Sequence, residues 1–244
     1  MENPFSLIGK TILVTGASSG IGRGVSVACS NMGATVILNG RNESRLQETK
    51  AQMDGNCELL IGDLTNDETL NSLVRALPKL DGVVHCAGIG QRVPCKNVSV
   101  ENVDEVMDVN FKAPALLMSA LLQQKKINKG ASIIFIASIA SRTPSFGNSV
   151  YSASKGAIIS YANCLALELA PRQIRVNCIS PAMVWTDLIL ADGIEEEQLK
   201  EDEQKYPLKR YGQPEDIANL AVYMLSDAST WMTGSNVKIS GGAN

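Results

Sequence analysis

Short, continuously apolar runs rich in β-branched residues alternate along the chain with longer segments whose apolar residues recur at helical spacing. Because these runs do not alternate between apolar and polar residues, we expect both faces of each strand to be buried, as in a parallel sheet covered by helices. Strand–helix–strand repetition predicts a three-layer, doubly wound α/β fold with a seven-stranded parallel sheet, and ligands beyond the carboxyl ends of its strands. The predicted strands cover residues 11–15, 35–39, 57–62, 81–88, 132–138, 174–180 and 236–240.

Length, charge and hydropathy exclude several classes of protein. The 244 residues, 45% of them hydrophobic, suffice for a single domain over residues 1–244. With a net charge of −3, the chain lacks the excess of positive charge that binds the phosphates of nucleic acids. No apolar stretch reaches the roughly 18 residues that a membrane-spanning helix needs. The first residues also lack the charged segment followed by a long apolar run that is typical of a signal peptide. We therefore expect no membrane association and no nucleic-acid partner.

The six cysteines are scattered, and there is one histidine. Without CxxC pairs or metal-ligand spacing, the cysteines indicate free thiols in a reducing cytoplasm. His85 lies inside an apolar run, so we expect a buried, hydrogen-bonded side chain rather than a catalyst. The sequence therefore predicts a cytoplasmic protein without a metal site.

A glycine cluster joins the first strand to a helical segment in the sequence TGASSGIG. Gly16, Gly20 and Gly22 would let the backbone turn tightly and approach a pyrophosphate, which the start of the helix attracts. A plain tight turn is the alternative interpretation. The position between strand and helix favours a dinucleotide site.

The second predicted strand ends in Asn39-Gly40-Arg41, without the carboxylate that usually binds the ribose 2′-hydroxyl of NAD. Arg41 would instead attract the additional phosphate of NADP, and Ser18 could add a hydroxyl to it. We therefore favour NADP(H) over NAD(H). The alternative is that Arg41 is a solvated turn residue.

Two further strand ends resemble walls of a cofactor pocket. Asp63-Leu64 follows the third strand, where the carboxylate could accept a hydrogen bond from an adenine amino group. The alternative is that Asp63 caps a helix together with Thr65. Cys86, Ala87 and Gly88 follow the fourth strand, where small residues let the backbone pack beside a ribose.

Tyr151 and Lys155 stand four residues apart in a helical segment, so they share a helix face. At about 6 Å and an effective dielectric of about 20, the ammonium would favour the phenolate by roughly 2–3 kcal/mol. Tyr151 could then exchange a proton with a developing alkoxide. A surface pair on the helix is the alternative.

Two polar residues could complete such a site. Ser138 ends an apolar run, where its hydroxyl could polarise a substrate carbonyl. Asn110 stands in a helical segment, where asparagine is disfavoured, which suggests a specific polar role. Capping or a satisfied core position is the alternative for both.

In order and approximate spacing, these motifs resemble the short-chain dehydrogenase/reductase family over essentially all 244 residues. They are TGASSGIG, Asp63-Leu64, CAG, the Asn110 segment, Ser138, YSASK and PAMVWT at 181–186. The resemblance implies a Rossmann fold and an oxidoreductase that interconverts a carbonyl and a secondary alcohol. Within the family, the overall sequence resembles slightly more those members that reduce 3-oxoacyl groups on an acyl carrier protein.

The resemblance also implies a role for each matching residue. Tyr151 would be the general acid/base, Lys155 would hold the nicotinamide ribose, and Ser138 would orient the carbonyl. Asn110 would support Lys155 through a water. The family further implies a homotetramer, or a homodimer, with helix faces near 101–125 and 152–170 between subunits. The cofactor site would comprise Gly16, Ser18, Ser19, Gly20, Ile21, Gly22, Arg41, Asp63, Leu64, Cys86, Ala87, Gly88, Tyr151, Lys155, Pro181, Val184 and Thr186.

Three departures from the family pattern matter. His85-Cys86 replaces the usual pair of asparagines, which removes the asparagine that braces the strand. Ala182 replaces the glycine after Pro181. Ser19 stands where NADP-preferring relatives often carry a basic residue, so Arg41 must supply the preference.

The substrate remains open between a 3-oxoacyl thioester and a small free ketone, sugar or alcohol. We expect a substrate lid over residues 187–213, where Leu188, Ile189 and Leu190 could cover a pocket and 195–203 would be a solvated helix face. Arg172, Lys209 and Arg210, or a second cluster of lysines, could dock an acidic carrier. A non-catalytic dinucleotide sensor is a further alternative.

Overall fold

The computed structural model describes residues 3–143, 145–190 and 195–243. Residues 191–194 of the predicted lid lie outside the described residues. All pairings within the sheet are parallel, and the strand order is β3-β2-β1-β4-β5-β6-β7. The strands are β1 (Thr11–Thr15), β2 (Thr35–Gly40), β3 (Cys57–Ile61), β4 (Leu80–His85), β5 (Ile127–Ile136), β6 (Arg175–Pro181) and β7 (Asn236–Ile239).

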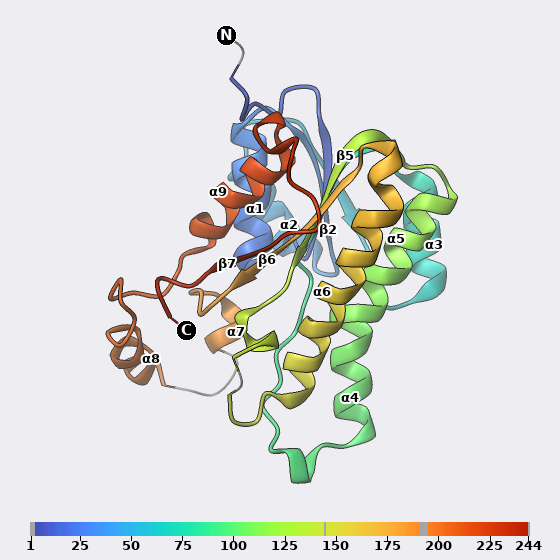
Figure 1. Ribbon diagram of the computed structural model, residues 1–244. Coiled ribbons are helices and arrows are strands. Elements are labelled where there is room, and N and C mark those ends of the chain that lie inside the picture. Colours follow the sequence, from blue (N-terminus) through green and yellow to red (C-terminus); the bar gives the residue numbers. More distant parts are fainter. Residues whose placement is uncertain (1–2, 144, 191–194, 244) are drawn as a thin grey trace.

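Helices cover both faces of the sheet (Figure 1). One face carries α1 (Gly20–Asn31), α2 (Glu43–Lys50) and α9 (Pro214–Leu225), and the other carries α3 (Asp67–Ala76), α5 (Ala113–Gln123) and α6 (Ser149–Leu169). The remaining α-helices of the described residues are α4 (Val100–Met107), α7 (Asp187–Leu190) and α8 (Glu196–Glu203). The predicted three-layer, doubly wound fold is confirmed.

The central strands are buried on both faces, as their apolar runs predicted. In β1, Leu13 belongs to the core under α3, α5 and α6, whereas Ile12 and Val14 belong to the core under α1 and α9. The same expectation was wrong for the two edge strands. Glu58 and Ile61 of β3 and Lys238 of β7 are exposed, because an edge strand lacks a neighbour and part of its helix cover.

The strand order reverses at β1: β2 pairs with it on one side, and β4 pairs with it on the other. In doubly wound sheets this reversal opens a crevice beyond the carboxyl ends of the strands. The register pairs Thr15 with Asn39 and with His85, so the segments that follow these three strands begin side by side.

Among the described residues, none of the helices combines the length and the apolar character that crossing a bilayer requires.

Candidate active site

The glycine loop after β1 is shaped by contacts that leave no space for side chains. Gly16 has a φ of +64°, and a Cβ there would lie 2.7 Å from the backbone nitrogen of Ala87. A Cβ on Gly22 would lie 2.1 Å from the carbonyl oxygen of Gly16. Since these obstacles are backbone atoms, glycine is required at both positions.

The loop leads into the start of α1, where Ser19 is the N-cap residue and makes no side-chain capping hydrogen bond. The first N–H groups of the helix and its positive dipole end can therefore serve a phosphate. This glycine cradle fits the pyrophosphate of a dinucleotide.

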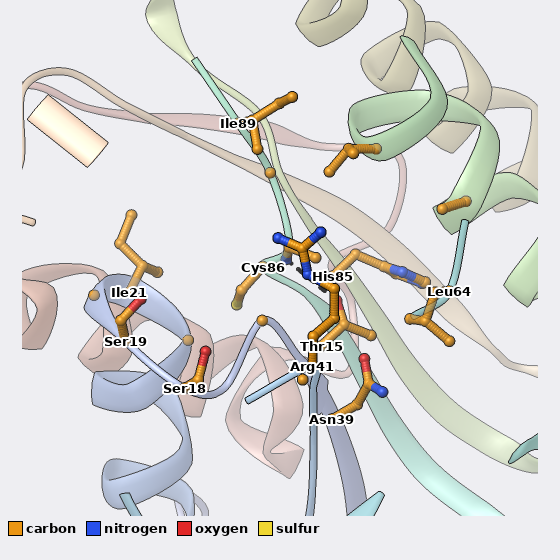
Figure 2. A pocket seen from close by; sticks show the side chains of 18 of the residues that line it. Thr15, Ser18, Ser19, Ile21, Asn39, Arg41, Leu64, His85, Cys86 and Ile89 are labelled. Carbon is orange, nitrogen blue, oxygen red and sulfur yellow. Dashed lines mark hydrogen bonds between the residues drawn. The ribbon is translucent and has the colours of Figure 1, made fainter. Parts of the chain in front are cut away.

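A cavity of about 320 Å³ extends from the glycine loop across the ends of β1 to β4 (Figure 2). Many of the residues that line it are among those predicted to bind the cofactor. These are Gly16, Ser18, Ser19, Gly20, Ile21, Gly22, Arg41, Asp63, Leu64, Cys86, Ala87, Gly88 and Thr186.

Arg41 and Asp63 form an ion pair at the edge of this cavity. The Arg41 Nη1 atom lies 3.6 Å from an Asp63 oxygen, and the Arg41 side chain is 73% exposed. Asp63 also accepts hydrogen bonds from the backbone N–H and the hydroxyl of Thr65, at 2.9 and 2.7 Å. Burial alone would raise the pKa of Asp63, but these hydrogen bonds and the charge of Arg41 lower it. The side chain of Asn66, not Asp63, caps α3.

His85 differs from its sequence prediction. It is buried, as expected, and stacks on Phe135 with ring centroids 4.4 Å apart. In the described part of the chain, however, neither ring nitrogen has a hydrogen-bond partner, so the expected hydrogen bond is wrong. An apolar run can predict burial, but a polar partner has to come from neighbouring strands or helices. Leaving such a group unsatisfied costs about 1–3 kcal/mol.

Replacing His85 with phenylalanine should make unfolding less sensitive to acid. Burial lowers the pKa of His85 from 6.5 to about 3. Below pH 6.5 the unfolded chain therefore takes up a proton that the folded chain refuses, and stability present above that pH is lost as the pH falls toward 3. One pH unit below 6.5, this loss approaches about 1.4 kcal/mol.

Urea unfolding of both proteins near neutrality and near pH 5.5, one unit below the unfolded pKa, measures this difference. Because all other titrating groups are shared, they cancel in the comparison. A difference between variant and wild type that stays constant with pH would contradict the prediction.

A second cavity, of about 360 Å³, adjoins the first. Ser138, Tyr151 and Lys155 line it together, although they come from the segment after β5 and from α6. The remaining predicted cofactor residues, Pro181 and Val184, line this cavity as well. The two cavities share Ile21, Cys86, Gly88, Thr186 and Leu188.

The backbone fixes Lys155 and Ser138. Lys155 is buried, and its Nζ donates to the Ile136 carbonyl at 2.9 Å and lies 5.7 Å from the centre of the Tyr151 ring. Burial lowers the pKa of Lys155 to about 8. Ser138 lies two residues beyond β5, and its oxygen accepts from the Ala140 N–H at 3.1 Å. Ser138 is therefore both a capping residue, as the alternative held, and a cavity residue.

Asn110 lies in a π-helical turn, Asp108–Lys112, between α4 and α5. Its amide oxygen accepts from the Ile89 N–H at 2.8 Å, and its nitrogen donates to the Ile89 carbonyl and the Ser154 hydroxyl. Asn110 lines neither cavity and ties the segment after β4 to α6 next to Lys155. Single π turns inside helices often mark functional sites.

Sequence reasoning missed several cavity residues. Arg45 and Asp187 line the first cavity, and Arg92 and Tyr206 line the second. Arg45 follows Arg41 by four residues, so the basic spacing could have indicated it. Arg92 and Tyr206 carry no local sequence signal, because only the fold brings their segments to the cavity at the start of α6.

No group of histidine, cysteine or acidic side chains with the arrangement of a metal site occurs among residues 3–143, 145–190 and 195–243.

The chain is similar to known dehydrogenases and reductases over nearly its full length. A family described as enoyl-(acyl carrier protein) reductase matches residues 16–244. The 3-oxoacyl-[acyl-carrier-protein] reductase FabG of Rickettsia felis is 35% identical over 236 residues, which cover 97% of each chain. Human dehydrogenase/reductase SDR family member 4 is 31% identical over 247 residues, covering 97% of this chain and 88% of that protein.

A solved structure from Beutenbergia cavernae has a closely similar fold. It is described as a candidate NAD(P)-dependent gluconate 5-dehydrogenase with bound NADP at low occupancy. The TM-score is 0.88 at 32% identity, and the match covers 98% of both chains.

Proposed function

This chain belongs to the short-chain dehydrogenase/reductase family of oxidoreductases, and from that premise we propose that it interconverts a carbonyl compound and a secondary alcohol with NADP(H). The observation that carries the proposal is the junction of the two cavities. A glycine cradle suited to a pyrophosphate opens directly beside a pocket that holds a phenol, an ammonium and a serine hydroxyl.

The residues present fit a nicotinamide dinucleotide. Gly16 and Gly22 leave room for a pyrophosphate, and the start of α1 supplies its N–H groups. Arg41 would meet the 2′-phosphate, Asp63-Leu64 and Cys86–Gly88 would flank the adenosine, and Val184 and Thr186 would hold the carboxamide. When bound, the nicotinamide supplies or accepts the hydride.

Tyr151 exchanges the proton that accompanies this hydride. In the reductive direction its hydroxyl gives a proton to the substrate oxygen, and in the oxidative direction the phenolate takes that proton back. The charge of Lys155, whose Nζ is 5.7 Å from the ring centre, stabilises the phenolate. Lys155 in turn is held by the Ile136 carbonyl, which keeps its charge at a fixed place.

Ser138 orients the carbonyl. Its oxygen is already fixed by the Ala140 N–H, so its own hydrogen can be donated to a substrate oxygen as negative charge develops there. Asn110 acts as a positioning residue, since its bonds join Ile89 to Ser154, the neighbour of Lys155. A water on this side of Lys155 would complete the proton relay.

The first candidate substrate is a 3-oxoacyl thioester, which the Rickettsia felis relative supports by its name. Free ketones and sugar acids are the second candidate, supported by the described activity of the Beutenbergia cavernae protein. Leu188 and Ile189 line the second cavity, which supports a lid over 187–213. Docking of an acyl carrier protein gains little support from Arg210, which is bound to Asp216 at 2.6 and 3.0 Å.

Loss of NADPH absorbance in the presence of 3-oxoacyl thioesters, simple diketones and keto sugars tests this function. We expect turnover with at least one carbonyl class. Tight NADPH binding without turnover of any carbonyl would instead favour the non-catalytic sensor.

A homotetramer is part of the proposal. Large apolar side chains are exposed on the helices that the family resemblance places between subunits. They include Val103 of α4, Leu116 of α5 and Leu167 of α6, the last 79% exposed. Light scattering combined with size-exclusion chromatography would give the mass of the assembly.

Replacing Arg41 with aspartate should weaken NADPH binding about 10–100-fold, because a charge-assisted bond to the 2′-phosphate is worth about 1.5–3 kcal/mol. NADH binding should change far less. Fluorescence titration with each cofactor measures both. If the two affinities fall by the same factor, Arg41 does not contact the 2′-phosphate.

A further inference from the structure

A second arginine, Arg45, lines the first cavity together with Arg41. Each of the two is held by a carboxylate. Arg41 pairs with Asp63, whereas Arg45 pairs with Asp187 at the start of α7. The two ion pairs therefore come from different parts of the chain and line one cavity (Figure 2 labels Arg41 among its lining side chains).

The fold directs the face of α2 that carries Arg45 toward the glycine loop. The Asn42 side chain caps the helix by accepting from the Arg45 N–H at 3.0 Å. One turn later, the buried Thr49 hydroxyl donates to the Ala17 carbonyl at 2.9 Å. Because Arg45 and Thr49 are four residues apart, they share this face, and Arg45 reaches into the cavity.

Arg23 strengthens this contact between α1, α2 and the glycine loop. Its guanidinium donates to the Ser18 carbonyl at 2.7 Å, to Thr49 at 3.1 Å and to Glu48 at 3.0 Å. Arg23 therefore joins α1, α2 and the glycine loop, whereas Arg41 and Arg45 line the cavity. These bonds hold α2 against the glycine loop, and the Arg45 side chain, which is 44% exposed, lines the cavity.

Asp187 belongs to a segment that borders both cavities. Its neighbours Thr186 and Leu188 line the two cavities, and Ile189 lines the second one. The side chains of Arg45 and Asp187 are 44% and 62% exposed, and an ion pair so exposed to water is weak. A stronger anion can therefore displace the carboxylate.

We propose that Arg45 is a second cation for the 2′-phosphate of NADP(H), and that Asp187 holds Arg45 until that phosphate replaces it. The proposal rests on the proposed preference for NADP(H). A phosphate offers a larger charge and more acceptor oxygens than a carboxylate, so the exchange favours the phosphate.

The exchange would couple the two ends of the site. Once Arg45 turns to the phosphate, Asp187 loses its partner, and its negative charge is repelled by the phosphate. NADP(H) would therefore break the Arg45–Asp187 ion pair, whereas NAD(H), which lacks the 2′-phosphate, would leave it in place.

Calorimetric titration with two cofactor fragments isolates the contribution of the 2′-phosphate. Adenosine 2′,5′-bisphosphate carries this phosphate, and adenosine 5′-monophosphate lacks it. We expect Arg45→Gln to weaken the bisphosphate about tenfold and to change the monophosphate by less than about twofold. Asp187→Asn, which removes the competitor, should tighten the bisphosphate by about two- to fivefold.

The double variant separates competition from independent effects. If Asp187 acts only by holding Arg45, the gain from Asp187→Asn disappears in the Arg45→Gln background. Lys50→Gln removes the same charge from the far end of α2, away from the cavity, and should leave both affinities unchanged. Monophosphate binding confirms in each variant that the site is folded.

Two results overturn the inference. One is an equal loss of affinity for both fragments in Arg45→Gln. The other is an Asp187→Asn gain that persists without Arg45. If the wild-type protein binds the two fragments equally, the proposed NADP(H) preference itself fails. If Arg41→Asp alone abolishes that preference while Arg45→Gln retains it, only the role of Arg45 fails.

Discussion

Tyr151→Phe should lower the turnover number by about 10²–10⁴-fold while changing cofactor affinity by less than about twofold. The substitution removes only the hydroxyl, so the ring continues to line the second cavity. Without the Tyr151 hydroxyl, the proton has to come from solvent, and the general acid/base catalysis that this hydroxyl provides is lost. NADPH consumption gives the turnover number, and fluorescence titration gives the affinity.

Tyr161→Phe provides a matched control on the same helix. Its hydroxyl donates to the Ala115 carbonyl at 3.3 Å, and the residue lines neither cavity. We expect this variant to cost some stability and to keep its activity. If Tyr151→Phe were as active as Tyr161→Phe, the proton-transfer role of Tyr151 would have to be abandoned.

Gly22→Ala should disable cofactor binding and weaken the fold. A Cβ at this position would lie 2.1 Å from the Gly16 carbonyl oxygen and 2.7 Å from its carbon. Because both are backbone atoms, the glycine loop itself has to move. Overpacking of this kind costs about 1–3 kcal/mol of stability, and a displaced pyrophosphate cradle should lower NADPH affinity roughly 10²-fold.

Gly156→Ala is the corresponding control. This glycine lies inside α6, and a Cβ there would meet nothing within 4 Å. We expect the variant to be unchanged or more stable by up to about 1 kcal/mol, as alanine favours helices over glycine. Urea unfolding without cofactor and NADPH titration give the two quantities. Normal NADPH affinity in Gly22→Ala would show that the loop is not a pyrophosphate cradle.

Contacts between residues far apart in the sequence explain why some site residues are harder to predict than others. Arg45 and Asp187 are 142 residues apart, and Asn110 and Ser154 are 44 apart. Neither pair leaves a periodic or local signal. Both arise because segments that follow different strands of one parallel sheet meet beyond its carboxyl edge: β4 and β5 are neighbours, whereas β1, β4 and β5 lie between β2 and β6.

The sequence alone determined the features that depend on the order of residues within one element. Continuous apolar runs predicted the parallel strands, the glycine cluster predicted the strand-to-helix turn, and the four-residue spacing of Tyr151 and Lys155 placed them on one helix face. Each of these follows from backbone geometry that repeats over a few residues.

Only the tertiary structure decided which elements face each other and how exposed each side chain remains. It left β3 partly exposed at the sheet edge, gave His85 no polar partner among the residues that the structure describes, and joined Ser138 to Tyr151 in one cavity. It also gave Arg45 its partner Asp187. The physical reason is that burial and hydrogen bonding depend on atoms contributed by several elements at once, and no stretch of a single chain segment contains them.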